Sequence, residues 1–151
     1  MSELLTYARK VFSGDLYAAE RTDAELTDIA ASATVQGGTA TARLTLQPYH
    51  RNAMGAVMGG VYFTLGDLAF AAASNAGCLS RHEPLQWVSL SSTIHYLAAA
   101  KGCQLVANAH CEKEGRTTCL YTIRITDSNS DLVALIETIG TRLSVSSTKS
   151  A

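Results

Sequence analysis

The longest apolar stretch of the chain, residues 57–75, has the length and composition that predict a helix. Its residues are apolar or small almost all the way round, whereas a helix in contact with solvent carries a polar stripe. We therefore expect protein to enclose it on every side. Its one ionisable side chain, Asp67, lies near the middle. Because an unpaired buried carboxylate is costly, Asp67 is expected either to be hydrogen-bonded or to have a chemical role.

The segments before this helix predict one short helix and two strands. Apolar residues within 3–13 are spaced for an amphipathic helix, which Gly14 would end. A first strand is expected near residues 26–35. Residues 39–46 alternate between apolar and polar side chains, as in a half-buried strand. The Gly37-Gly38 pair between the two strands favours a hairpin.

Four further strand-like runs follow the long helix. They are residues 86–97, 104–113, 117–126 and 132–145, and we expect them to form a four-stranded antiparallel meander. The complete order predicts an α+β fold in which one antiparallel sheet wraps around a single long central helix. At 151 residues the chain is expected to form one domain, residues 1–151, with a frayed tail at 146–151. The exposed edge of such a sheet can be protected by a second copy of the chain.

Composition and charge narrow the range of functions. A formal net charge of -1 gives no electrostatic reason to expect nucleic-acid binding. The four cysteines form no CxxC pair and no His lies at metal-ligand spacing from them, so we expect reduced thiols, a cytoplasmic location and no metal or redox cofactor. The N-terminus does not resemble a signal peptide. Residues 57–79 are long enough to span a bilayer, but Asp67 near the midpoint would cost roughly 3 kcal/mol, so no membrane span is expected.

The start of the long helix suggests chemistry on a carbonyl group. Gly59 and Gly60 open the helix and leave its first backbone N–H groups accessible to a ligand oxygen. The Gly59 N–H and the helix dipole can polarise a carbonyl, and Asp67 can act as a general base or as a nucleophile. Asn52, seven residues before Gly59, can help to hold an acyl group or a water molecule.

This order of elements, with this motif, resembles the hotdog-fold acyl-CoA thioesterases, and most closely the PaaI-type branch of the 4-hydroxybenzoyl-CoA thioesterase superfamily. The branch has an Asn, then a His-Gly-Gly helix start, then an Asp eight residues after the first Gly. Asn52, Met58-Gly59-Gly60 and Asp67 occupy these places. The run VSLSSTIHYLAAAKG, residues 88–102, resembles the second signature strand of the branch, with Tyr96 matching.

The resemblance implies that the protein hydrolyses an acyl-CoA thioester, as a homodimer or homotetramer with its active site between subunits. It implies no cofactor beyond the coenzyme A of the substrate. The implied catalytic residues are Asp67, Gly59, Asn52 and Ser89, and the expected substrate-binding positions are Met58, Gly60, His50 and Met54. Ser89 stands where relatives carry a Ser or Thr that contacts the catalytic water or acid. Met58 departs from the family pattern, because a thioether, unlike the usual His, cannot donate a hydrogen bond.

The spacing of Gly59 and Asp67 constrains any mechanism. Eight residues on one helix separate them by about 12 Å along the axis. Both groups must approach one carbonyl carbon to roughly 3 Å, so a single chain does not bring them together unless the substrate bridges two turns. In agreement with the family's interface site, we expect Asn52 and Gly59 of one subunit to face Asp67 of the other.

Simpler roles remain open for every one of these residues. Asp67 can be a structural acid, the glycines can serve close packing, and Asn52 can be an ordinary loop residue. Ser89 can belong to a polar strand face, His50 can be solvated or packed, and Met54 and Met58 can belong to the core.

The alternative function is a non-catalytic acyl-CoA-binding module on the same fold. A hotdog dehydratase fits poorly, since the helix start has no His. The acyl group, and the choice between coenzyme A and an acyl-carrier protein, are left open.

Overall fold

The computed structural model describes residues 1–32 and 37–144. The helices are α1 (Glu3–Phe12), α2 (Gly59–Ser74) and α3 (Ala76–Ser80), with a π-helical turn η1 (Tyr17–Arg21) and a 3-10 turn η2 (Pro48–His50). The strands are β1 (Glu25–Ala31), β2 (Gly38–Thr45), β3 (Trp87–Tyr96), β4 (Gln104–Glu114), β5 (Thr118–Thr126) and β6 (Leu132–Arg142).

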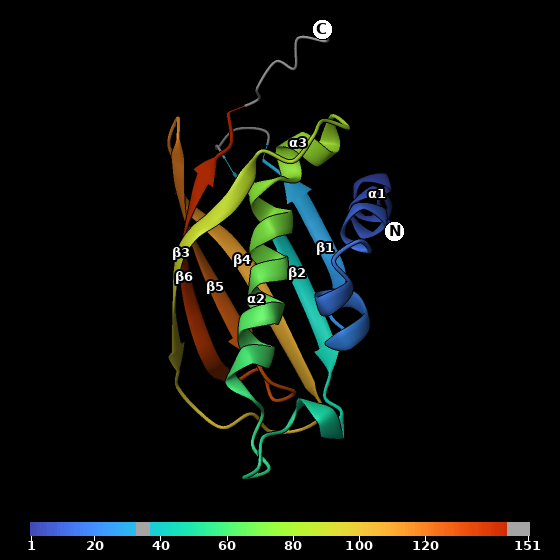
Figure 1. Ribbon diagram of the computed structural model, residues 1–151, viewed down its shortest axis with the longest axis vertical. Helices are drawn as coiled ribbons and strands as arrows, with labels where there is room; N and C mark the ends of the chain where they lie inside the picture. The colour runs from blue at the N-terminus through green and yellow to red at the C-terminus, as the bar shows by residue number, and fades with distance from the viewer. Residues whose placement is uncertain (33–36, 145–151) are drawn as a thin grey trace, which may run out of the picture.

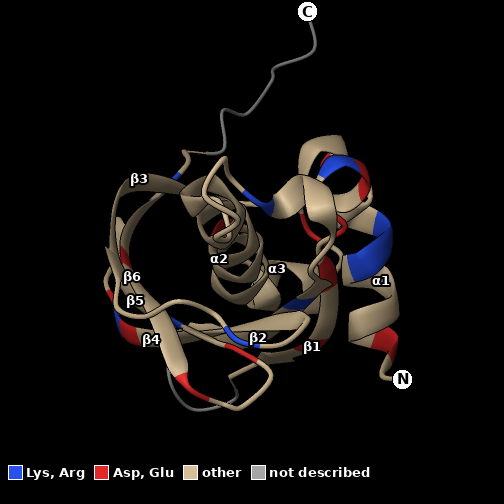
Figure 2. Ribbon diagram, turned by 90° about the horizontal axis from the view of Figure 1, so that it is seen from below, with Lys and Arg blue, Asp and Glu red and all other residues tan. Residues whose placement is uncertain are grey.

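One six-stranded antiparallel sheet curls around α2, while α1 lies beside β1 (Figures 1 and 2). The core lies between α2 and the concave face of the sheet. In β2, for example, every second side chain is buried, as the alternation predicted. The fully buried Ala69, Ala72 and Ala73 let α2 approach the strands closely. The predicted architecture, one antiparallel sheet around one long helix, is confirmed.

The short N-terminal helix is also confirmed. Ser2 caps it, because its Oγ accepts a hydrogen bond of 3.1 Å from the N–H of Leu5. Its apolar face buries Leu5, Ala8 and Phe12. Between α1 and β1 the chain forms the π-helical turn η1, in a segment for which the sequence pattern predicts no element.

The order of the strands differs from the predicted four-stranded meander. The order in the sheet is β1-β2-β4-β5-β6-β3, so β3 pairs with β6 and β4 pairs with β2. Only β4, β5 and β6 form a meander. After α3, which lies near β1 and β2, the chain crosses to the opposite edge of the sheet and forms β3 there. It then returns through residues 97–103 to β4 in the middle of the sheet (Figure 1). Strand pairing is a long-range choice, and the sequence pattern of a strand does not specify its partner.

The prediction that protein encloses α2 on every side is wrong for the single chain. Gly60, Phe63 and Asp67 are exposed, and Thr64 and Ala71 are half-buried. Their spacing of three to four residues places them along one face of the helix. A single curled sheet covers only part of the circumference of a helix, which leaves this α2 stripe uncovered.

Some expected features fall outside the described residues. They are the end of the first predicted strand, Val145 of the last strand, and the tail at 146–151. β1 and β2 do pair as a hairpin, with Ala31 opposite Gly38. No helix among the described residues is long and apolar enough to cross a membrane.

Candidate active site

A tight loop, residues 51–57, leads into α2, and Asn52 organises it. The Asn52 Oδ1 accepts hydrogen bonds from the N–H groups of Met54 (2.9 Å) and Ala56 (3.1 Å). The Asn52 N–H donates to the Ala56 carbonyl (2.8 Å), and Gly55 takes a positive φ of 80°. The side-chain oxygen of Asn52 is therefore engaged in the loop. Its NH₂ has no partner within residues 1–32 and 37–144.

The start of α2 presents free backbone donors. The Met58 N–H donates to the His50 carbonyl (2.8 Å), which fixes the entry of the chain into the helix. Met58 is the N-cap residue, and its side chain makes no capping hydrogen bond. Gly59 and Gly60 belong to the first turn, where N–H groups have no acceptor within the helix. In the part of the chain that the structure describes, neither N–H has another protein acceptor.

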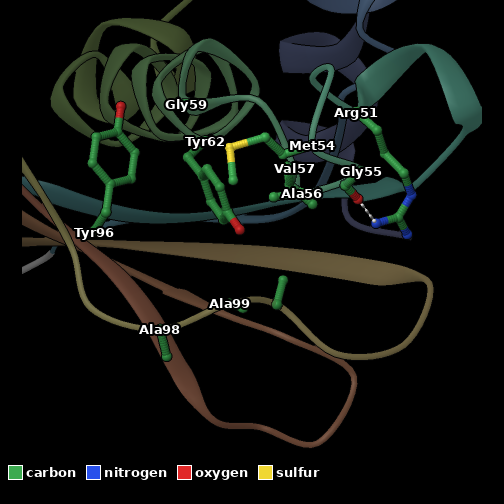
Figure 3. A pocket seen from close by; sticks show the side chains of 11 residues that line it. Arg51, Met54, Gly55, Ala56, Val57, Gly59, Tyr62, Tyr96, Ala98 and Ala99 are labelled. Atoms are coloured by element: carbon green, nitrogen blue, oxygen red, sulfur yellow. Dashed lines mark hydrogen bonds between the residues drawn. The ribbon is translucent and has the colours of Figure 1, made fainter.

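A cavity of about 560 Å³ opens beside this helix start, and we call it the Gly59 cavity (Figure 3). The loop before α2, the first turn of α2 and the segment after β3 enclose it. It is lined by Arg51, Met54, Gly55, Ala56, Val57, Gly59, Tyr62, Tyr96, Ala98, Ala99 and Ala100.

Tyr96 lies directly against Gly59 in this cavity. A Cβ built on Gly59 would be 2.7 Å from the Tyr96 hydroxyl oxygen, so only glycine fits here without moving the phenol. Figure 3 shows the hydroxyl of Tyr96 directed toward the helix. The ring packs edge to face on Tyr62, with centroids 5.9 Å apart. The Tyr96 hydroxyl has no hydrogen-bond partner among the described residues, so it adds a second available donor beside the helix start.

Asp67 opens into a different cavity of about 460 Å³, which we call the Asp67 cavity. It lies between η1 with its preceding residues and the α2 stripe, and it is lined by Asp15, Leu16, Tyr17, Ala18, Phe63, Thr64, Asp67, Leu68 and Ala71. Asp67 is exposed in the single chain, yet partial desolvation by these neighbours, together with the negative charge of Asp15, raises the pKa of its carboxyl. Such a shift moves a carboxylate toward the range of a useful general base.

The two cavities share no lining residue. Gly59 and Asp67 of one chain therefore do not converge on a common point, in keeping with their separation of about 12 Å along the helix. A site that uses both groups requires either a long substrate or a second chain.

The remaining sequence-predicted residues lie in varied places. Met54 lines the Gly59 cavity and is 92% exposed, whereas the side chain of Met58 is exposed outside its lining. Gly60 faces open space. Ser89 is exposed on β3, opposite Gly140, and lines neither cavity.

His50 is buried in η2, in contrast to a solvated loop position. Its Nδ1 accepts a hydrogen bond of 3.0 Å from the Gln47 N–H. Its Nε2 is buried without a partner among the described residues. The imidazole thus stabilises η2, and the His50 carbonyl accepts the hydrogen bond from the N–H of Met58.

Sequence reasoning missed the walls of both cavities. Arg51, Tyr62 and residues 98–100 line the Gly59 cavity, and residues 15–18 line the Asp67 cavity. Tyr96 was part of the family motif, but residues 15–18 carry no periodic signal. No group of three or more His, Cys, Asp or Glu side chains suited to a metal ion occurs in the described ranges.

A family model for the thioesterase superfamily matches residues 54–134, more than half of the chain. The chain belongs to the thioesterase superfamily. The matched region includes α2 with Gly59 and Asp67, and continues through β3, β4 and β5 into β6.

Comparisons with individual proteins agree with this membership. A protein of Archaeoglobus fulgidus, provisionally named an esterase, is 35% identical over 98 residues, which cover 65% of this chain and 60% of that relative. The E. coli PaaI protein from the phenylacetic acid degradation operon has the same fold, with a TM-score of 0.71, 22% identity and coverage of 93% of this chain and 96% of that one. A hypothetical thioesterase of Streptococcus pneumoniae, solved with coenzyme A, gives a TM-score of 0.67 at 25% identity, covering 88% and 94%. The expected hotdog fold is confirmed.

Proposed function

We propose that this protein hydrolyses an acyl-CoA thioester to the free acid and coenzyme A. The observation that carries the proposal is that α2 of a thioesterase-superfamily chain has both a free N–H donor at Gly59 and an acid of raised pKa at Asp67. The coenzyme A bound to the Streptococcus pneumoniae relative supports this choice of thiol.

The chemistry needs a polarised carbonyl and an activated attacking oxygen. The Gly59 N–H and the positive end of the α2 dipole stabilise the negative charge that develops on the carbonyl oxygen. Asp67 as a general base removes a proton from water, the resulting hydroxide adds to the carbonyl carbon, and the C–S bond then breaks to release the thiolate, which takes up a proton. Asp67 as a nucleophile would instead attack the carbonyl carbon and expel the thiolate, which takes up a proton, and water would then hydrolyse the mixed anhydride to the free acid and the Asp67 carboxylate.

We propose that the site is completed between two subunits. The α2 stripe and the β3 edge form an uncovered surface with exposed apolar side chains such as Met58, Phe63 and Leu90. A two-fold dimer that pairs the α2 helices in opposite directions would set Gly59 of one chain against Asp67 of the other. It would also cover the stripe that the sheet leaves exposed.

In this mechanism Tyr96 supplies a hydrogen-bond donor at the helix start, where Met58 stands in place of the expected His. Met58 donates no hydrogen bond, while the Tyr96 hydroxyl lies at the Gly59 backbone and is free to donate. We assign it to the thioester oxygen as a second donor. The NH₂ of Asn52 is a third available group at the mouth of the loop.

Removal of the Asp67 charge tests the proposal. Asp67→Asn is expected to lower kcat/KM for a panel of acyl-CoA esters by about 10²- to 10⁴-fold, because an amide neither accepts the proton nor attacks the carbonyl. Release of free thiol measures the rate. In the wild type, kcat/KM should fall as the pH falls through the pKa of Asp67, which desolvation and the charge of Asp15 raise above the ordinary aspartate value.

Circular dichroism and the unfolding midpoint control for loss of fold in this variant. Wild-type rates in folded Asp67→Asn would overturn the assignment. The alternative, a binding module, is favoured by the lack of a donor at Met58. It predicts saturable binding of acyl-CoA with no thiol release by the wild type.

A further inference from the structure

The two cavities of the proposed site differ in charge. Arg51 is the only charged side chain among the residues that line the Gly59 cavity, and it donates a hydrogen bond of 3.0 Å to the Gly55 carbonyl. The Asp67 cavity contains two carboxylates, Asp15 and Asp67, and no basic residue in its lining. The rest of that lining is mainly apolar.

A thioester of coenzyme A also has two chemically different arms. The thiol arm continues to phosphate groups and carries negative charge, and the acyl arm varies. With the reacting carbonyl between Gly59 of one subunit and Asp67 of the other, one arm extends into the Gly59 cavity of the first subunit and the other arm into the Asp67 cavity of the second. Charge complementarity directs the phosphate-bearing arm past Arg51 and away from the two carboxylates. The acyl arm then lies in the Asp67 cavity.

We propose that the Asp67 cavity selects thioesters whose acyl group is apolar and uncharged, and that Asp15 rejects acyl groups ending in a carboxylate. This inference rests on the proposed function. Asp15 and Asp67 share one cavity from opposite elements, the segment before η1 and the α2 stripe. An acyl carboxylate placed there would meet two like charges and would lose its hydration against apolar walls.

The walls suit an apolar group of moderate size. Leu16 and Tyr17, which lie outside the α2 stripe, are 56% and 69% exposed in the free chain, so they present apolar surface that a ligand can cover. The volume of about 460 Å³ lies within the range of roughly 300–1,000 Å³ that is usual for small-ligand pockets. Thr64 adds little polarity, because its hydroxyl already donates to the Gly60 carbonyl (2.9 Å).

Two substrates of equal length test the selection, namely hexanoyl-CoA and adipoyl-CoA, which differ in a terminal carboxylate. The wild type should have the higher kcat/KM for hexanoyl-CoA. Asp15→Asn should raise the ratio of adipoyl to hexanoyl kcat/KM by about tenfold or more, because it removes one of the two like charges. Asp15→Lys should raise it further. We compare the ratio of the two kcat/KM values because substitution of Asp15 can also change the ionisation of Asp67. Such a change alters both kcat/KM values by the same factor, so it cancels in the ratio.

Asp28→Asn is the matched control, since Asp28 is exposed on β1 and lines neither cavity. It should leave the ratio unchanged. An equal change of the ratio in Asp28→Asn and Asp15→Asn would overturn the inference, as would a wild type that prefers adipoyl-CoA or an Asp15→Asn ratio equal to that of the wild type. These outcomes leave hydrolysis by Asp67 standing. Hydrolysis of no thioester by the wild type would instead overturn the proposed function itself.

Discussion

Met58 and Tyr96 together determine which donors surround the first turn of α2. The thioether at position 58 is exposed and donates nothing, while the phenol at position 96 contacts the Gly59 backbone position. Glycine at 59 therefore has two uses, since it exposes its N–H and leaves room for the phenol. In the proposed mechanism, the Tyr96 hydroxyl supplies the donor that Met58 lacks.

Tyr96→Phe is expected to lower kcat by about 10²-fold with a much smaller change in KM, because it removes a donor that acts on the charge of the transition state. Stability should change little, since the hydroxyl has no partner among the described residues. Steady-state kinetics on an acyl-CoA ester measure the effect.

Tyr7→Phe provides the control, because Tyr7 lies on α1, outside both cavities, and packs on His82. Adding Met58→His to Tyr96→Phe should recover part of the lost kcat, since an imidazole at that position can donate a hydrogen bond. An unchanged kcat in Tyr96→Phe would remove the phenol from the mechanism.

At the level of elements, close contact between α2 and the sheet depends on small residues. Gly38 begins β2 where it passes the C-terminal end of α2, and its N–H donates to the Tyr121 hydroxyl (3.0 Å). A Cβ on Gly38 would lie 2.6 Å from the Ala30 carbonyl oxygen and 2.8 Å from that of Ala73. Both are backbone atoms, which cannot relieve the steric clash by a change of rotamer as a flexible side chain can.

Gly38→Ala is therefore expected to lower the free energy of unfolding by about 1–3 kcal/mol, through displacement of α2 or β1. Denaturant unfolding followed by circular dichroism measures it. Gly60→Ala is the same chemical change on the exposed stripe, where a Cβ meets nothing within 4 Å. It should cause no loss of stability, and equal losses in the two variants would contradict the packing argument.

At the scale of the whole molecule, the uncovered surfaces lie together on one side. β1 is an edge strand beside α1, and β3 is the other edge strand (Figure 2). β3 carries exposed apolar side chains, among them Leu90 at 64% exposure. Unpaired strand edges promote association with a further strand. Together with the α2 stripe, this edge forms the surface of the proposed dimer.

Leu90→Lys should reduce the molecular mass of the protein in solution from that of at least two chains to that of one chain. It should also abolish thioester hydrolysis, because a single chain keeps Gly59 and Asp67 apart. Light scattering and the activity assay measure the two effects. Leu120→Lys introduces the same charge on β5, where the neighbouring Cys119 and Tyr121 point into the core and Leu120 points outward. It should leave the assembly and the activity in place. An active monomer of Leu90→Lys would contradict the site shared between subunits.

Much of this structure follows from local patterns. The alternation in residues 39–46, the apolar run around Asp67 and the four strand-like runs after it predict a long helix and an antiparallel sheet wrapped around it. The glycine pair and Asp67 are likewise visible as candidate chemistry. These features depend on neighbours in the sequence, whose spacing indicates the type of element.

Contacts between distant segments account for the rest. The pairing of β3 with β6 and the exposure of Asp67 on one stripe of α2 depend on which strands meet and how far one sheet can curl. The placement of Asp15 opposite Asp67 and of Tyr96 against Gly59 depends on the same packing. The physical reason is that side chains far apart in the chain become neighbours only when the sheet closes around the helix, and no local periodicity encodes that register.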